Sequence, residues 1–81
     1  MKNILEYTKE LVEGLYSLDP TYDIRVQPNK IIVTEPGDGH TYTIEMVSEL
    51  FRVELEYGFD YYDTILGSVG QVISFIWNRG A

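Results

Sequence analysis

The sequence predicts an α+β fold in which an N-terminal helix, a four-stranded antiparallel meander and a C-terminal helix follow one another. Apolar residues near both ends of the chain recur at spacings of three and four, the period of a helix with one buried face. Between these segments, apolar and polar residues alternate, as in strands whose two faces differ. We expect both helices to cover one face of the sheet, in a single small domain spanning residues 1–81.

The first helix is expected over residues 4–18. Asn3 followed three positions later by Glu6 has the form of a capping box. Pro20 ends the helix, because proline disfavours helical geometry in the residue before it, Asp19. The buried stripe is expected to contain Ile4, Leu5, Thr8, Leu11, Val12, Leu15 and Leu18.

Four strands are expected over residues 22–27, 30–35, 41–47 and 51–57. The last of these also permits a helix through Met46, Leu50, Val53 and Tyr57, but that helix leaves Phe51 and Leu55 on another stripe, so we favour the strand. Residues 48 and 49 must turn the chain without glycine. The wet face should carry Asp23, Arg25, Gln27, Thr34, Thr41, Thr43, Glu45, Arg52, Glu54 and Glu56, with Ile32 and Val47 as apolar exceptions.

The last helix is expected to begin at Asp60, with Asp63 near the positive end of its dipole, and to end near Asn78 with Gly80 as a cap. Its core stripe would contain Ile65, Leu66, Val69, Val72, Ile73, Ile76 and Trp77. A row of small residues with an off-stripe aromatic suggests close approach by another element, either within the monomer or in a dimer. These self-association candidates are Gly67, Gly70, Ser74 and Phe75.

Charge is concentrated in one part of the chain. Residues 35–63 contain eight acids and one base, Arg52, and so carry the whole net charge of −7. Such a surface disfavours direct binding to nucleic acid or to a membrane and favours a basic protein surface as partner. The chain has no cysteine, which fits a cytoplasmic protein, and its longest uncharged run, residues 64–78, is shorter than the roughly 20 residues that span a bilayer.

No residue pattern indicates catalysis. The single histidine, His40, is interpreted as a solvated residue in a glycine-rich loop, where no cysteine accompanies it as nucleophile. The same loop offers only Glu35 and Asp38 as oxygen ligands, fewer than a calcium loop provides, and it is interpreted as a plain turn. We therefore expect no catalytic residues, no metal, no cofactor and no enzyme activity.

The strongest candidate site is the acidic and aromatic segment of residues 54–63. Tyrosine is enriched at protein interfaces because it joins a large apolar body to a polar tip. The expected partner-binding residues are Glu45, Glu54, Glu56, Tyr57, Asp60, Tyr61, Tyr62 and Asp63. On the alternative interpretation, the aromatics pack under the last helix and the acids only keep the protein soluble.

In size, acidity, lack of cysteine and layout, the chain resembles the small acidic phage proteins that block host nucleic-acid-binding enzymes, including anti-CRISPR proteins and DNA mimics. The resemblance implies a viral inhibitor that occupies a basic channel by partial DNA mimicry. Three hypotheses remain: an acidic inhibitor or adaptor, a self-associating structural or accessory protein that dimerises through its last helix, and a small hydrolase or metal-dependent enzyme. We favour the first.

Overall fold

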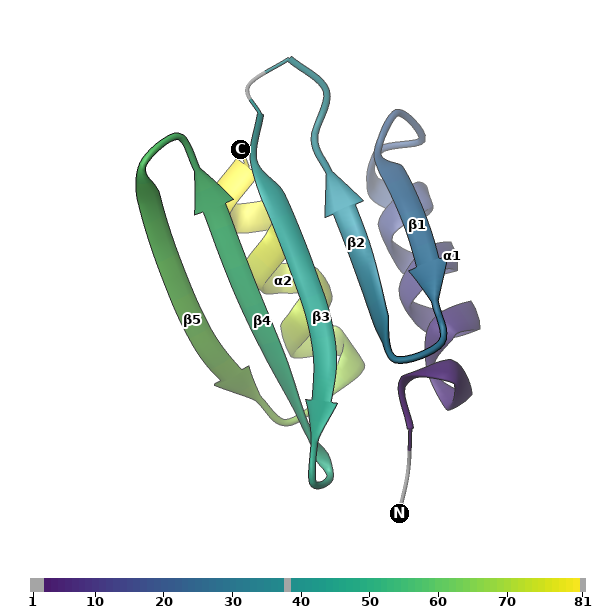
Figure 1. Ribbon diagram of the computed structural model, residues 1–81. Helices are drawn as coiled ribbons and strands as arrows, with labels where there is room; N and C mark the ends of the chain where they lie inside the picture. The colour runs from purple at the N-terminus through teal and green to yellow at the C-terminus, as the bar shows by residue number, and fades with distance from the viewer. Residues whose placement is uncertain (1–2, 38, 81) are drawn as a thin grey trace.

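The computed structural model describes residues 3–37 and 39–80, which form two α-helices and a five-stranded antiparallel sheet (Figure 1). The strands neighbour one another in chain order, β1-β2-β3-β4-β5. The elements are η1 (Ile4–Glu6), α1 (Thr8–Leu18), β1 (Asp23–Gln27), β2 (Lys30–Thr34), β3 (Thr41–Val47), β4 (Leu50–Tyr57), β5 (Asp60–Leu66) and α2 (Val69–Gly80).

Tight turns set the register of the sheet. Val47 pairs with Leu50 and Tyr57 with Asp60, so two residues suffice for each connection. The first residue of each turn, Ser48 or Gly58, has a positive φ of 58° or 61°. A positive φ at this position is the rule in two-residue hairpins, because it matches the twist of the paired strands. Ser48 thus adopts the positive φ that a glycine most often supplies in such a turn.

The core lies between the sheet and the helices, which Figure 1 shows behind the sheet. Alternate residues of β2, β3 and β4 enter it, and they are almost completely buried. The two helices meet where Gly14 of α1 lies against the side chain of Ile73 of α2, so a Cβ at position 14 would collide with that isoleucine. The buried apolar residues are Ile4, Leu11, Leu15, Tyr22, Ile31, Val33, Tyr42, Ile44, Phe51, Val53, Leu55, Val72 and Ile76.

The expectation of four strands is wrong, because residues 60–66 form a fifth strand instead of the start of the last helix. The segment Tyr61 to Ile65 is rich in aromatic and β-branched residues, which favour strands over helices. Gly58 and Phe59 form the tight turn that returns this segment antiparallel to β4. Strand assignment for β4 itself, favoured over the helical alternative, is confirmed.

The last helix starts later than expected, at Val69, and runs through Gly80. Its N-terminus has an unexpected cap formed by Ser68 and Gln71, a variant of the capping box in which the Gln71 side chain reaches the residue before Ser68. The Ser68 hydroxyl accepts a hydrogen bond from the Gln71 backbone N–H at 3.2 Å, and the Gln71 side chain accepts one from the Gly67 N–H at 2.8 Å. Asp60 and Asp63 therefore do not cap a helix.

The expected core stripes are only partly correct. Trp77 and Ile65, both assigned to the core, are 40 % and 49 % exposed, and Leu5 and Leu18 of the first segment are exposed too. Phe75, expected off the stripe, instead packs edge-on against the buried ring of Tyr42. The Asn3 side chain accepts a hydrogen bond from the Leu5 N–H at 2.7 Å, but it caps a 3-10 turn that precedes α1. Neither described helix has the length and apolarity that a bilayer crossing requires.

Candidate functional site

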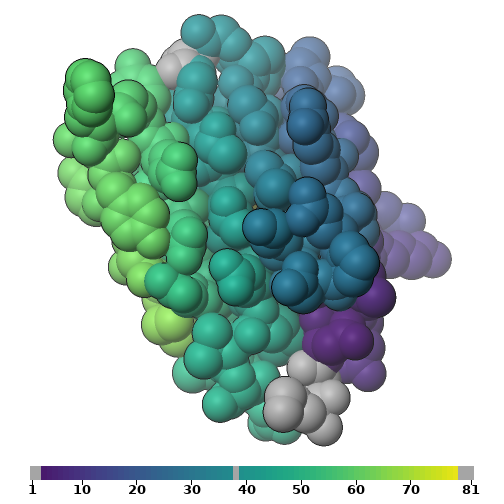
Figure 2. Space-filling view, viewed as in Figure 1, coloured from purple at the N-terminus to yellow at the C-terminus, as the bar shows by residue number. Residues whose placement is uncertain are grey.

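The face of the sheet that points away from the helices, here called the open face, carries most of the predicted acids. Figure 2 views the molecule from this side. The strand register brings residues that are distant in the sequence next to one another across β3, β4 and β5, because paired residues project to the same face. The acidic residues gathered there are Glu45, Glu54, Glu56 and Asp63, with the exposed ring of Tyr61 beside them.

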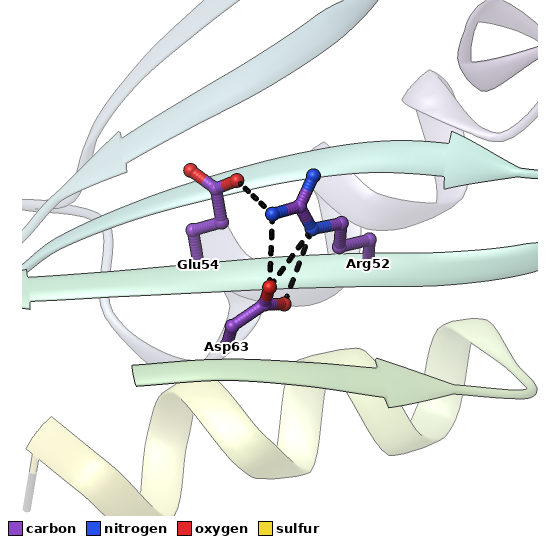
Figure 3. A network of polar contacts seen from close by, with 3 residues as sticks. All are labelled: Arg52, Glu54 and Asp63. Atoms are coloured by element: carbon purple, nitrogen blue, oxygen red, sulfur yellow. Dashed lines mark hydrogen bonds and ion pairs between the residues drawn. The ribbon is translucent and has the colours of Figure 1, made fainter. Parts of the chain in front are cut away.

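Arg52 lies among these acids and binds two of them (Figure 3). Its Nε donates to Asp63 Oδ1 and Oδ2 at 3.2 and 3.1 Å, and its Nη2 donates to Asp63 Oδ2 at 2.9 Å. The same Nη2 lies 2.9 Å from Glu54 Oε1. The hydrogen bond and the negative charge of Asp63 raise the pKa of Arg52, and Glu54 adds to the effect. Arg52 thus holds Glu54 and Asp63 in fixed positions.

The part of the open face formed by β3, β4 and β5 remains acidic after this compensation, because Arg52 is the one basic residue of these strands and its ion pairs go to Glu54 and Asp63. Glu45 is the register partner of Arg52 across β3 and β4. Glu56 pairs with Thr41 and Tyr61 and has no basic neighbour in the register. Partial removal from water raises the pKa of Tyr61, and the charge of Glu54 and a hydrogen bond to it raise it further. The Tyr61 phenol therefore stays neutral beside the acids, where it is able to donate a hydrogen bond.

The eight predicted partner-binding residues lie on both faces of the sheet. Tyr57 pairs with Asp60, and Tyr62 pairs with the buried Leu55, so these three residues belong to the helix side of the β4–β5 hairpin. Only Glu45, Glu54, Glu56, Tyr61 and Asp63 share the open face. The physical reason is the two-residue period of β5, which sends Tyr61 and Tyr62 to opposite faces although both are 53 % exposed.

The tip of the β4–β5 hairpin joins the two faces. Phe59 projects from the turn and is fully exposed, which is unusual for so large an apolar ring. Tyr61 follows it on the open face and Tyr62 on the helix side, so exposed aromatic rings lie on both faces at this end of the hairpin. These aromatics were expected at the turn into the last helix, whereas they lie in the β4–β5 turn and in β5.

A buried polar cluster at the end of β2 was not expected. Glu35 is only 7 % exposed, and its Oε1 accepts a hydrogen bond from the Tyr42 hydroxyl at 2.9 Å. His40 is not a solvated loop residue: its side chain is 18 % exposed, its Nδ1 lies 3.8 Å from Glu35 Oε2, and its ring stacks on Tyr57 with centroids 4.2 Å apart. The signal was available, because Glu35 continues the alternation of the core residues Ile31 and Val33.

The predicted self-association row on the last helix is broken up by the fold. Gly67 lies before α2 and donates its N–H to Gln71, while Phe75 packs inside the monomer against Tyr42. Only Gly70 and Ser74 remain as exposed small residues of α2. The glycine that permits close helix approach is Gly14, on the other helix.

Within residues 3–37 and 39–80, no group of three or more histidine, aspartate or glutamate side chains is arranged to hold a metal ion. Asp38, considered above as a ligand, lies outside the described residues. Comparison with known proteins adds no relative, since no family model, no curated protein and no solved structure matches the chain.

Proposed function

We propose that this protein is a non-catalytic binding module whose open face docks on a basic surface of a partner protein. The observation that carries the proposal is the gathering of Glu45, Glu54, Glu56 and Asp63 on β3, β4 and β5 of the open face, where Arg52 is the one basic residue of these three strands. The other bases of that face, Arg25 and Lys30, lie on β1 and β2. Opposite charge on a partner accelerates encounter and sets orientation, and it disfavours partners of the same charge.

The exposed aromatic residues add apolar contact area, which charge alone does not provide. Interfaces obtain most of their affinity from a few anchors, in which tyrosine is over-represented. Tyr61 stands among the acids and Phe59 projects beside them, so a partner that meets the charges also covers apolar rings. Arg52 contributes by holding Glu54 and Asp63 in place before binding, which reduces the entropy lost on docking.

A nucleic-acid-binding protein is the class of partner that this surface suits best, because such proteins carry dense positive charge. Mimicry of a duplex would be partial. Glu54 and Glu56 are two residues apart on one strand, roughly 6.7 Å, whereas duplex DNA carries a charge about every 1.7 Å along its axis. Arg52 lowers the charge density of the open face further. Inhibition of such a partner by occupation of its groove, in the manner of an anti-CRISPR protein, is the corresponding activity.

A matched pair of charge variants tests the proposal. The open-face variant replaces Glu45, Glu54 and Glu56 by glutamine. The control variant replaces Glu6, Glu10 and Glu13, which lie on the N-terminal helical segment, by glutamine as well. Both variants carry the same net charge, three units less negative than the wild type, so they differ only in which surface has lost its acids. Arg52 and Asp63 are kept to preserve the folded hairpin.

Each protein is immobilised and exposed to a nucleic-acid-depleted lysate at salt concentrations from about 50 to about 500 mM, which spans Debye lengths of roughly 14 to 4 Å. We expect wild type and control to retain the same basic protein at low salt and to release it at high salt, and the open-face variant not to retain it. The retained protein should also lose its nucleic acid when the wild type is added. Equal retention by both variants would show that position on the open face is irrelevant and would refute the proposal.

A further inference from the structure

The outer edge of β5 is an unpaired strand edge. Among the described residues, β5 pairs only with β4, and Figure 1 shows it as the outermost strand of the sheet. An edge of this kind presents a row of N–H and C=O groups to which another chain is able to add a strand. Natural proteins protect such edges with charged side chains, lysine above all, and with proline, bulges or short strands. β5 has seven residues and contains neither lysine nor proline; its two charged residues are Asp60, on the helix side, and Asp63, which Arg52 binds.

The opposite edge of the sheet is better protected. β1 has five residues, carries Arg25 at its centre and is followed directly by Pro28. Arg25 lies 3.7 Å from Asp23, and both side chains are well exposed, so charge covers this edge. The two edges therefore differ in length and in net charge, because Asp23 and Arg25 cancel on β1 while β5 carries two acids, and only β5 combines an unpaired edge with exposed aromatic rings on both faces.

The outward backbone groups of β5 follow from its hairpin. Residue pairs in an antiparallel ladder alternate between hydrogen-bonded and non-hydrogen-bonded, and the pair that flanks a two-residue loop, here Tyr57 and Asp60, is of the hydrogen-bonded type. Every second residue of β5 therefore directs its backbone N–H and C=O away from β4. These residues are Tyr61, Asp63 and Ile65, whose side chains lie on the open face.

The side chains on either side of the β5 edge determine which kind of strand is able to bind there. An added strand would lie about 4.8 Å from β5, with one row of side chains beside Tyr61 and Asp63 and the other beside Tyr62 and Leu66. The first row meets Tyr61, Asp63 and Ile65, with Glu54 and Glu56 of β4 behind them; although Arg52 binds Asp63 and Glu54, the acids outnumber this base, and the row favours lysine or arginine. The second row meets an aromatic ring and a half-buried leucine and favours apolar residues. A second copy of this chain is a poor occupant, because it would bring another net charge of −7 to the same edge.

We propose that β5 binds an extended segment of the partner, with alternating basic and apolar residues, as an added strand of the sheet. The inference rests on the proposed function, since it describes how the basic partner engages the same acidic hairpin. Main-chain hydrogen bonds to Tyr61, Asp63 and Ile65 supply affinity in this mode of recognition, and the flanking side chains supply specificity.

A synthetic peptide of alternating lysine and valine, about eight residues long to cover β5, is the probe. Binding is measured by titration calorimetry, and the backbone amides are followed by NMR hydrogen exchange. Two further peptides carry N-methyl groups on the lysines only or on the valines only. Because alternate residues of a strand point their N–H groups to opposite sides, we expect one methylated peptide to lose at least about tenfold in affinity while the other binds nearly as well as the parent.

On the protein, Ile65→Pro removes one outward N–H at a position where an edge strand tolerates proline, and Ile65→Thr is the matched control that keeps the N–H. We expect the proline variant to bind at least about tenfold more weakly than the threonine variant, and the amides of Tyr61, Asp63 and Ile65 to become protected in the wild-type complex. The methylated peptides and the amide protection test the wild-type protein itself, so the result does not depend on folding of the proline variant.

The outcomes separate this inference from the proposed function. If both methylated peptides bind equally and the β5 amides stay unprotected, while the open-face charge variant still loses the peptide, strand addition is overturned and docking through the acids stands. If methylation matters but both charge variants bind equally, strand addition stands and the acidic-face function is overturned. If protection of β5 appears without peptide and rises with protein concentration, the occupant is a second copy and the inference is overturned.

Discussion

Replacement of Tyr42 by phenylalanine tests the buried polar cluster that joins β3 to the loop after β2. The Tyr42 side chain is completely buried, and its hydroxyl donates to Glu35 Oε1 at 2.9 Å. A second contact, to the carbonyl oxygen of Ile76 in α2, is 3.4 Å long and contributes little. The substitution removes one oxygen and leaves the aromatic packing intact, so its effect reports the hydrogen bond to Glu35.

The expected loss of unfolding free energy is about 2 kcal/mol, between the net value of a neutral hydrogen bond and that of a bond to a charged group. A domain of 81 residues has a total stability of roughly 4 to 12 kcal/mol, so the loss is a large fraction of it. The thermal midpoint should fall by roughly 8 to 16 °C, since about 1 kcal/mol corresponds to 4 to 8 °C in a domain of this size.

The assay is urea and thermal unfolding followed by circular dichroism, with Tyr16→Phe as the control. Tyr16 lies on α1 with its side chain 40 % exposed, so the same chemical change should cost less than about 0.5 kcal/mol there. A double-mutant cycle with Glu35→Ala should give a coupling energy of about 1 kcal/mol or more. If Tyr42→Phe costs no more than Tyr16→Phe, or if the cycle shows no coupling, the hydrogen bond does not stabilise the fold and the reasoning is refuted.

Two further predictions concern helix packing and pH. Gly14→Val should lower the unfolding free energy by about 1 to 3 kcal/mol, because the new side chain collides with Ile73. Adding Ile73→Ala should restore most of this free energy. Gly70→Val is the control, because position 70 has room for a side chain; a comparable loss there would contradict the explanation. Hydrogen bonds from Thr21 hold the pKa of Asp19 below its ordinary value, so this group stabilises the protein near neutral pH, and the contribution is lost as the pH falls below about 4. Thr21→Val should raise the pKa of Asp19, measured by carbon-13 NMR titration. The same variant should lower the thermal midpoint near neutral pH but not at about pH 2. An unchanged pKa of Asp19 would show that the Thr21 hydroxyl has no effect on the carboxyl group.

The fold class, the first helix and the first four strands were predictable, because local patterns determine them. Residues 51–57 illustrate this: alternation placed Phe51, Val53 and Leu55 on one face, and all three are buried in β4. The fifth strand was missed because apolar residues from Ile65 onward fit a helical period, while Gly58 and Phe59 were not recognised as a two-residue turn. The capping box at Ser68 and Gln71, visible in the sequence, would have corrected the helix start.

The candidate site was predictable in composition but not in geometry. The sequence by itself determined that the negative charge and a cluster of aromatic residues belong to residues 35–63, because charge and residue type need no fold to be counted. Only the tertiary structure decided which of them share a surface, because strand register turns Tyr61 to the open face and Tyr62 to the helix side. It also decided that Arg52 compensates Glu54 and Asp63, that Glu35 is buried under Tyr42, and that β5 forms an unpaired edge. Each of these depends on how the strands pair and which residues the fold covers, about which local periodicity carries no information.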